Sequence, residues 1–308
     1  RFLGRRFQSS FVAQNRERFA FDISEGADGY CSVQPHGQPL PLTEIAFLVL
    51  QQLATLARHT AGGQPFTECV LTVPAHASFR QRDALRQAAQ KAGMAVRAVV
   101  NEPTAAALYY ANLRNPQQTV LIFDLGGGTF DATLMSVENR MVKVLATGGD
   151  AFLGGANFDA ALAEALVQSF AQRHGIDLRS DRVVMQRLAF AAESAKIALS
   201  TMEQAQVRLP CVARDAAGNF LDLEQTLTRA QFEELCFQLI ERTTATCDDV
   251  LSRARMTANQ VDELVLVGGQ TRMPAIRRRM AHFKRFSSEK EIHPELGVAV
   301  GAALLGRN

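Results

Sequence analysis

Cysteine is scarce in this chain, and no disulfide or metal-binding pattern is visible. The five cysteines are widely separated and include no C-x-x-C pair, and the six histidines do not cluster with them. These spacings argue against a disulfide framework and a zinc site, and they favour a reduced, cytoplasmic setting.

Long apolar runs and blocks of like charge are also missing. The run Ile45–Leu50 is far shorter than the about 20 residues of a membrane-spanning helix, and no signal peptide is visible. The formal net charge is +2, without a basic tail. Neither nucleic acid nor a membrane is therefore an expected partner.

What is present is the composition of a globular chain. Apolar residues make up 47% of the 308 positions and charged residues 21%, which allows a substantial core. The length suggests two domains or one bilobed unit. Short apolar runs alternate with amphipathic stretches, which predicts an α/β fold.

The pattern predicts the following elements. Strands are expected at 19–22, 30–33, 68–74, 96–100, 119–124, 129–137, 141–147, 207–210, 220–223 and 263–267. Helices are expected at about 43–56, 78–92, from 102 onward, and at 156–174, 181–200, 228–253, 274–283 and 294–305.

An internal repeat suggests two related lobes. A short buried strand, a turn and an amphipathic helix occur at 68–92 and again at 263–283. Two α/β lobes of similar build are implied. The second lobe opens with a three-strand meander, whereas the first lacks one.

The densest motif is the segment Asp124–Asp131, which reads DLGGGTFD. A buried strand delivers Asp124 to its carboxyl end, and three glycines permit a turn whose backbone N–H groups can face a phosphate. Thr129 adds a hydroxyl, and two flanking carboxylates suit a hydrated Mg²⁺. The alternative is a plain hairpin whose glycines serve only the turn, and the acid at the strand end favours phosphate binding.

Other segments are ambiguous when taken alone. Glu102 begins a helix after a strand, which is either ordinary acid placement or a site near phosphate. Gly268-Gly269-Gln270-Thr271-Arg272 is either a β–α turn or a close approach to a nucleotide. Glu193 and Lys196 are either an ion pair within one helix or nucleotide contacts. His76, His174 and His293 are isolated, and no catalytic role is assigned to them.

Several exact words in order resemble the nucleotide-binding domain of the seventy-kilodalton heat-shock (DnaK-type) chaperone family. NEPTAAA at 101–107, DLGGGTFD at 124–131 and LVGGQTRM at 266–273 match the family letter for letter. RFLGRRF at 1–7, ECVLTVPA at 68–75, DLRSDRVVMQRL at 177–188 and AAESAKIALS at 191–200 are similar to it. The resemblance covers essentially the whole chain.

The resemblance implies an actin-like ATPase fold of the ribonuclease H-like type, with two lobes around a nucleotide cleft. The first lobe would be residues 1–115, closed by a C-terminal helix at 288–308. The second would be 116–287, with a smaller subdomain at about 154–235. ATP or ADP with Mg²⁺ would be bound, and a J-type cochaperone and a nucleotide-exchange factor would be partners.

The resemblance also implies roles for individual residues. Asp124 would orient the attacking water, Thr129 would contact the γ-phosphate, and Asp124, Glu102 and Asp131 would hold metal-bound water as catalytic and metal residues. Pro74 and Arg82 match an allosteric relay. The nucleotide-binding residues would be Gly126, Gly127, Gly128, Gly155, Glu193, Lys196, Ser200, Gly268, Gly269, Arg272 and Glu295.

The chain departs from the family pattern at some points. The first phosphate hairpin and the lysine that would precede Arg1 are absent, so we expect an N-terminally truncated first lobe, as a fragment rather than a relic. No peptide-binding domain for unfolded clients is included. Ile197 stands where many members carry arginine, Ala156 replaces an acid, His293 replaces asparagine and Glu295 replaces aspartate.

The motifs and the departures from the family pattern leave three alternative functions for this chain. The first is a chaperone ATPase domain that hydrolyses ATP when complete. The second is an impaired module that binds nucleotide weakly or not at all and hydrolyses nothing. The third is an interaction or filament protein of the same fold, against which the chaperone-specific words argue.

Overall fold

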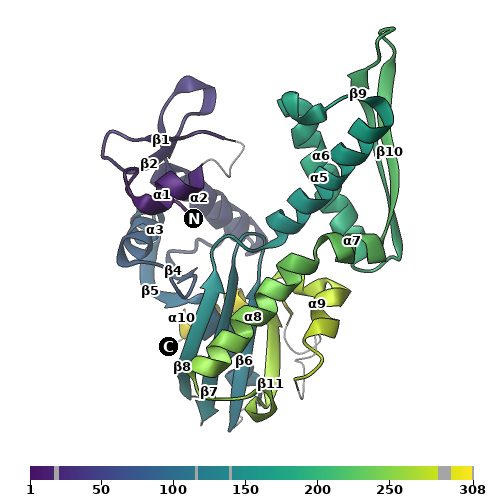
Figure 1. The fold of residues 1–308 in the computed structure, drawn as a ribbon. Helices are drawn as coiled ribbons and strands as arrows, with labels where there is room; N and C mark the ends of the chain where they lie inside the picture. The colour runs from purple at the N-terminus through teal and green to yellow at the C-terminus, as the bar shows by residue number, and fades with distance from the viewer. Residues whose placement is uncertain (17–20, 115–116, 139–140, 284–292, 307–308) are drawn as a thin grey trace. The chain divides into compact units, whose positions relative to one another are not determined.

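The structure, a computed structural model, describes residues 1–16, 21–114, 117–138, 141–283 and 293–306. The chain divides into two compact units, Arg1–Asn112 with Gly297–Asn308, and Leu113–Leu296. Each unit combines helices with strands (Figure 1), so the protein is of mixed α/β class. Within the described ranges, every helix is too short or too polar to cross a bilayer.

The first unit contains two small sheets and their covering helices. Its elements are α1 (Ser10–Asn15), β1 (Ile23–Glu25), β2 (Cys31–Val33), β3 (Leu40–Pro41), α2 (Leu42–Thr60), β4 (Glu68–Val73), α3 (Phe79–Lys91), β5 (Ala95–Asn101), α4 (Glu102–Arg114) and α10 (Gly297–Gly306). β1, β2 and β3 form an antiparallel sheet, and β4 pairs with β5 in parallel.

The strand β4 is less buried than the sequence suggests. Only Leu71 and Val73 of β4 are buried, and Leu71 packs with Ala89 of α3 and with Met94. The prediction of a buried strand therefore holds for Leu71 and Val73 and not for the rest of β4, because the described sheet has only two strands. The strand expected at 19–22 lies partly outside the described residues, and the described strand begins at Ile23.

The second unit is built on a four-stranded sheet with strand order β11-β6-β7-β8. β6 (Gln118–Leu125), β7 (Phe130–Glu138) and β8 (Met141–Asp150) form an antiparallel meander, and β11 (Glu263–Val267) lies parallel to β6. The remaining elements are α5 (Gly155–His174), α6 (Arg182–Leu199), β9 (Gln204–Arg214), β10 (Phe220–Thr228), α7 (Arg229–Leu235), α8 (Phe237–Arg253) and α9 (Pro274–Arg279).

Burial explains why this sheet forms. The side chains of β11 are all buried, as are most of those of β6 and β7. The rings of Phe123 and Phe130 pack against each other across the β6–β7 pair, with centroids 4.6 Å apart and an angle of 55° between the ring planes. α8 packs on β7 and β8, and α5 and α6 lie side by side next to the β9–β10 hairpin (Figure 1). The sheet therefore holds the β6–β7 turn on a rigid support.

Three predicted helices have different limits in the structure. The helix expected at 228–253 is two helices, α7 and α8, which break at the buried Cys236 without a glycine or proline to announce the break. α9 ends at Arg279 rather than 283. The last helix starts at Gly297, because the Pro294 carbonyl accepts a hydrogen bond from the Gly268 N–H (2.9 Å) and stays outside it. Residues 288–292 of the expected closing helix lie outside the described residues.

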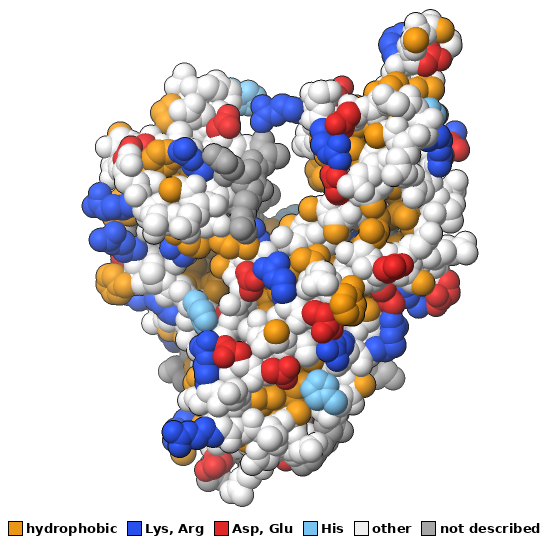
Figure 2. All heavy atoms as spheres, in the orientation of Figure 1, with side chains coloured by type: hydrophobic (Ala, Val, Ile, Leu, Met, Phe, Trp, Pro, Cys, Tyr) orange, Lys and Arg blue, Asp and Glu red, His pale blue; other side chains and the backbone are white. Residues whose placement is uncertain are grey.

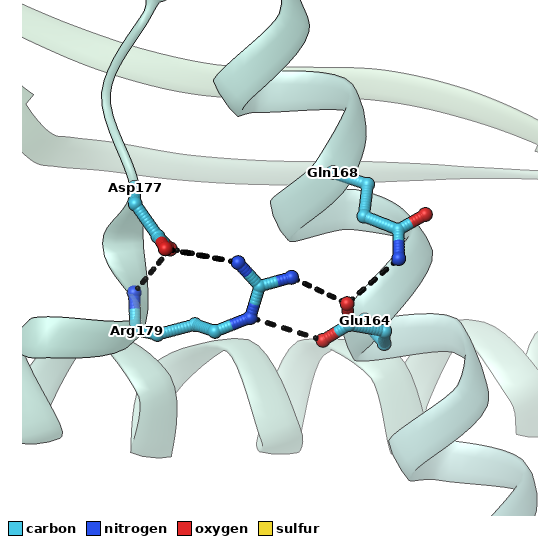
Figure 3. Close-up of polar contacts among 4 residues, drawn as sticks. All are labelled: Glu164, Gln168, Asp177 and Arg179. Carbon is cyan, nitrogen blue, oxygen red and sulfur yellow. Dashed lines mark hydrogen bonds and ion pairs between the residues drawn. The ribbon is translucent and has the colours of Figure 1, made fainter.

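A polar cluster fixes the loop after α5 (Figure 3). The Arg179 guanidinium donates to both carboxylate oxygens of Asp177 at 3.0 Å and also pairs with Glu164 of α5. Gln168 donates to the same Glu164 carboxylate at 2.7 Å. On the face drawn in Figure 2, basic and acidic side chains are interspersed with apolar ones.

Candidate functional site

The loop between β6 and β7 forms a tight turn that leaves one glycine open. Asp124 pairs in register with Asp131, and Leu125 pairs with Phe130. The Gly126 N–H donates to the Thr129 carbonyl at 3.1 Å and closes the turn. A Cβ added at Gly127 would meet nothing within 4 Å, and the Gly127 N–H has no partner among the residues that the structure describes. This N–H is the kind of donor that phosphate oxygens accept from.

The start of α5 is bonded directly to this loop. The N–H groups of Gly155 and Ala156 donate to the carbonyls of Gly126 (2.9 Å) and Gly127 (2.8 Å). A Cβ at Gly154 would lie 2.5 Å from the Gly128 nitrogen, so a side chain there would push the loop away. The glycine-rich loop and the start of α5 are therefore held together by direct hydrogen bonds.

The turn after β11 also packs closely against this loop. Gly268 has a φ of +87°, and a Cβ there would lie 2.2 Å from the Leu125 carbonyl oxygen. Both the left-handed backbone and the close approach require glycine. Gly268 is thus explained first by backbone packing, whereas Gly127 is not.

A cavity of about 680 Å³ opens beside these turns, a size that fits a small-molecule ligand. It brings together many residues that the sequence analysis proposed for nucleotide binding. They are Gly126, Gly127, Gly155, Glu193, Lys196, Ser200, Gly269, Arg272 and Glu295. Ile197, Ala198, Thr201 and Gln270 complete the lining.

The other proposed residues of this unit lie outside the lining. Asp124 and Asp131 flank the glycine-rich turn, Gly128 and Thr129 lie within it, and Gly268 packs behind it. Glu102, Pro74 and Arg82 belong to the first unit.

The first-unit residues lie around the ends of β4 and β5. Glu102 begins α4 directly after β5, and Pro74 follows β4. Arg82 of α3 donates to the Asn101 side-chain oxygen at 2.6 Å and to the Ala77 carbonyl at 3.2 Å. The catalytic and allosteric roles suggested for them stay predictions.

Lys196 forms a different ion pair from the one considered in the sequence. Its Nζ lies 2.9 Å from Oδ1 of Asp159 on α5, and it also donates to the Gly155 carbonyl at 3.4 Å. Burial raises the pKa of the Asp159 carboxyl, Lys196 opposes that rise, and Glu193 adds to it. Asp159 escaped the sequence analysis because nothing in the spacing links α5 to α6.

A second polar group borders the cavity at Arg272. Its Nε donates to Glu295 at 3.1 Å, and its Nη2 lies 3.2 Å from Nε2 of His293. The backbone N–H of Glu295 donates to Nδ1 of the same imidazole at 3.3 Å. His293 lies beside no other polar motif in the sequence, so its position along the chain alone did not indicate this contact.

Asp124 carries the most perturbed carboxyl in this region. Burial, and then the nearby charge of Asp131, raise the pKa of Asp124 to about 7. Two carboxylates on adjacent strands, one of them destabilised as an anion, suit a hydrated divalent cation. Within the described ranges there is no group of three or more His, Cys, Asp or Glu side chains that could hold a metal directly, and Mg²⁺ bound mainly through water does not need one.

The fold and the cavity define a mixed α/β protein with a glycine-walled pocket for a small ligand. Comparison with known proteins gives the family. The profile of the Hsp70 protein family matches residues 1–307. The chain is 40% identical over 305 residues to the chaperone protein DnaK of Deinococcus deserti, covering 99% of this chain and 48% of the relative.

Other relatives agree. The DnaK chaperone of Thermus thermophilus is 40% identical over 305 residues, covering 99% of this chain and 49% of its own length. A mitochondrial heat shock 70 kDa protein of Solanum tuberosum is 40% identical over 306 residues, covering 99% and 44%. The chain belongs to the Hsp70 family, and it spans about half the length of these relatives.

Proposed function

We propose that this chain is the nucleotide-binding domain of a DnaK-like chaperone, and that it binds ATP or ADP with Mg²⁺ at the cavity of the second unit. The observation that carries the proposal is the open Gly127 in the lining of a cavity that Lys196 and Arg272 also line. The open backbone at Gly127 suits phosphate oxygens, and Lys196 and Arg272 can donate hydrogen bonds to the ribose hydroxyls and ring nitrogens of an adenosine.

Different residues around the cavity would bind the phosphates and the adenosine of the nucleotide. Gly126, Gly127 and Gly128 would cradle the phosphates, with Gly155, Gly268 and Gly269 keeping the backbone close. Thr129 would donate its hydroxyl to the terminal phosphate. The adenosine side of the cavity would be Glu193, Lys196, Ser200, Arg272 and Glu295.

In hydrolysis, the carboxylates would act on water rather than on phosphate. Ionised Asp124 would accept a hydrogen bond from the attacking water and orient it, and Asp131 and Glu102 would hold water around the cation. A bound Mg²⁺ would supply positive charge to the phosphate oxygens. Phosphoryl transfer depends mostly on such positioning and charge.

The two units would correspond to the two lobes of an actin-like ATPase. A J-type cochaperone and a nucleotide-exchange factor would be partners, and the setting would be cytoplasmic. The second candidate function is a binding module without turnover, favoured by the Asp124 pKa of about 7, which leaves a large fraction of this carboxyl protonated at neutral pH.

Calorimetric titration with MgADP tests the proposal. We expect saturable binding by the chain, and at least about a tenfold loss in Gly127→Val, where the added side chain fills the open space that the phosphates would use. Ala216→Val, at the exposed tip of the β9–β10 hairpin, is the matched control and should bind normally. A chain that binds no nucleotide refutes the proposal. If the chain binds nucleotide, measurement of phosphate release from ATP separates an enzyme from a binding module without turnover.

A further inference from the structure

The C-terminal end of α6 supplies one wall of the cavity in the second unit. The lining residues from this stretch are Glu193, Lys196, Ile197, Ala198, Ser200 and Thr201. The helix ends at Leu199, and Ser200 at its C-cap has right-handed backbone angles, with φ −69° and ψ −26°. The left-handed residue that commonly helps to satisfy the last carbonyls of a helix is therefore missing here, and other donors are needed.

Arg229, the first residue of α7, supplies two of these donors. Its Nε donates to the Leu199 carbonyl at 2.8 Å, and its Nη2 donates to the Met202 carbonyl at 2.8 Å. The backbone N–H of Arg229 also donates to the Glu203 carbonyl at 2.8 Å. Only 17% of the Arg229 side chain is exposed, so its bonds are largely shielded from water. Arg229 thus joins the end of α6 to the start of α7.

The arrangement of the acceptors suits an arginine. A guanidinium presents several N–H groups in one plane and can reach separate acceptors at once, whereas a lysine ammonium is a point charge on a flexible stem. A cation at the C-terminal end of a helix is also favoured by the helix dipole. Nη1 of Arg229 pairs with Oε1 of Glu203 at 2.5 Å, but 82% of the Glu203 side chain is exposed, so that ion pair contributes little. The bonds to the two carbonyls are the ones that hold α6.

We propose that Arg229 is a positioning residue of the nucleotide cavity, which holds the end of α6 in the conformation that places Ser200 and Thr201 in the lining. The inference rests on the proposed function for the identity of the ligand. Without the two carbonyl bonds of Arg229, the wall that would face the adenosine loosens. The glycine-rich loop stays in place, because it is held by its own hydrogen bonds to the start of α5.

Backbone amide exchange followed by NMR tests the positioning without nucleotide. The N–H groups of Ser200 and Met202 donate to the carbonyls of Ile197 (3.1 Å) and Ala198 (2.8 Å), so their exchange reports on the end of α6. Arg229→Met keeps much of the side-chain volume and removes the donors. We expect exchange at these two amides to become at least about tenfold faster, while the Gly155 amide of α5 changes less than about twofold. Unchanged exchange at Ser200 and Met202 refutes the inference.

Three variants separate the carbonyl bonds from the charge and from general destabilisation. Glu203→Ala removes the ion pair and keeps both carbonyl bonds, so its exchange should stay within about twofold of the unmodified chain. Arg208→Met removes the exposed pair with Glu224 on the β9–β10 hairpin (2.7 Å) and should also have no effect. Arg229→Lys keeps the charge and should recover part of the loss. An effect of Glu203→Ala as large as that of Arg229→Met refutes the assignment to the carbonyl bonds.

Calorimetric titration with MgADP connects the positioning to the cavity. Measured at a temperature where all variants are folded, the affinity of Arg229→Met should be about tenfold below that of the unmodified chain, and that of Glu203→Ala should be within about twofold. Faster exchange in Arg229→Met with unchanged ADP affinity would refute the link between Arg229 and the cavity. If the unmodified chain binds no ADP, the proposed function fails, and the amide exchange still decides whether Arg229 holds the end of α6.

Discussion

Asp124→Asn should stabilise the folded chain at high pH while abolishing its proposed catalytic role. The Asp124 carboxyl has its pKa raised from 3.8 to about 7 by burial and by Asp131. Because the folded-state pKa lies above the unfolded value, the folded state holds a proton that the unfolded chain releases. The associated stability is complete below about pH 4 and is lost as the pH rises to about 7.

The size follows from the shift. About three pKa units at 1.36 kcal/mol each amount to about 4 kcal/mol, of which about 3 kcal/mol falls between pH 5 and 8. Asparagine is similar in shape to the protonated carboxyl and does not titrate. The free energy of unfolding of Asp124→Asn minus that of the unmodified chain should therefore rise by about 3 kcal/mol from pH 5 to pH 8.

Urea unfolding in EDTA measures this difference. Far-ultraviolet circular dichroism is the suitable probe, since the chain has no tryptophan. Added Mg²⁺ should recover stability at pH 8 in the unmodified chain and not in the variant, because the ion favours the carboxylate. A free-energy difference between the two proteins that is constant from pH 5 to 8 would refute the assignment of a buried, cation-seeking carboxyl.

Three further predictions concern the surroundings of the loop. Gly154→Ala should destabilise the chain by about 1–3 kcal/mol in urea unfolding, because its Cβ would lie 2.5–2.6 Å from the Gly128 backbone. Gly155→Ala should cost less than about 1 kcal/mol, because its tightest contacts are the ends of two side chains, Lys196 Nζ at 2.9 Å and Gln270 Oε1 at 3.3 Å, and the backbone of Gly127 lies at an ordinary 3.5 Å; equal losses would contradict this. Asp159→Leu should lower ADP affinity more than Asp159→Asn, which keeps an acceptor for Lys196, and equal affinities in the calorimeter would show that the ion pair does not orient the lysine. Maleimide at pH 7 should label Cys211 first, because it is the exposed cysteine, and mass spectrometry of the digested protein would reveal a different first site.

The sheet of the second unit was predictable because its strands are strongly apolar. β11 matches the prediction residue for residue, and β6, β7 and β8 lie where the runs of Val, Leu and Phe suggested. The shortness of these runs, their β-branched residues and the glycines that follow β6 and β11 favour a strand over a buried helix. The break at Cys236 was not predictable, because apolar periodicity continues across it and tertiary packing decides where the helix ends.

The candidate site was predictable only in part, for a similar reason. The family resemblance of the motifs predicted Gly127, Lys196 and Arg272 as nucleotide-binding residues, and all three line the same cavity. Asp159 and His293 could not be found, because each acts through a partner on another element. Sequence patterns report contacts along one helix or strand, whereas these contacts depend on how elements pack. The roles of Glu102, Pro74 and Arg82 stay predictions.

The bonding of α5 to the glycine-rich loop has a consequence for how the sequence can change. The N–H groups of Gly155 and Ala156 at the start of α5 donate to the carbonyls of Gly126 and Gly127, so this clamp between helix and loop is made by backbone atoms. Such a clamp is indifferent to the side chain at position 156, where this chain has alanine instead of the acid of the family pattern. The charge of the residue at position 156 can therefore change, in evolution or by design, without loss of the hydrogen bonds that join α5 to the loop.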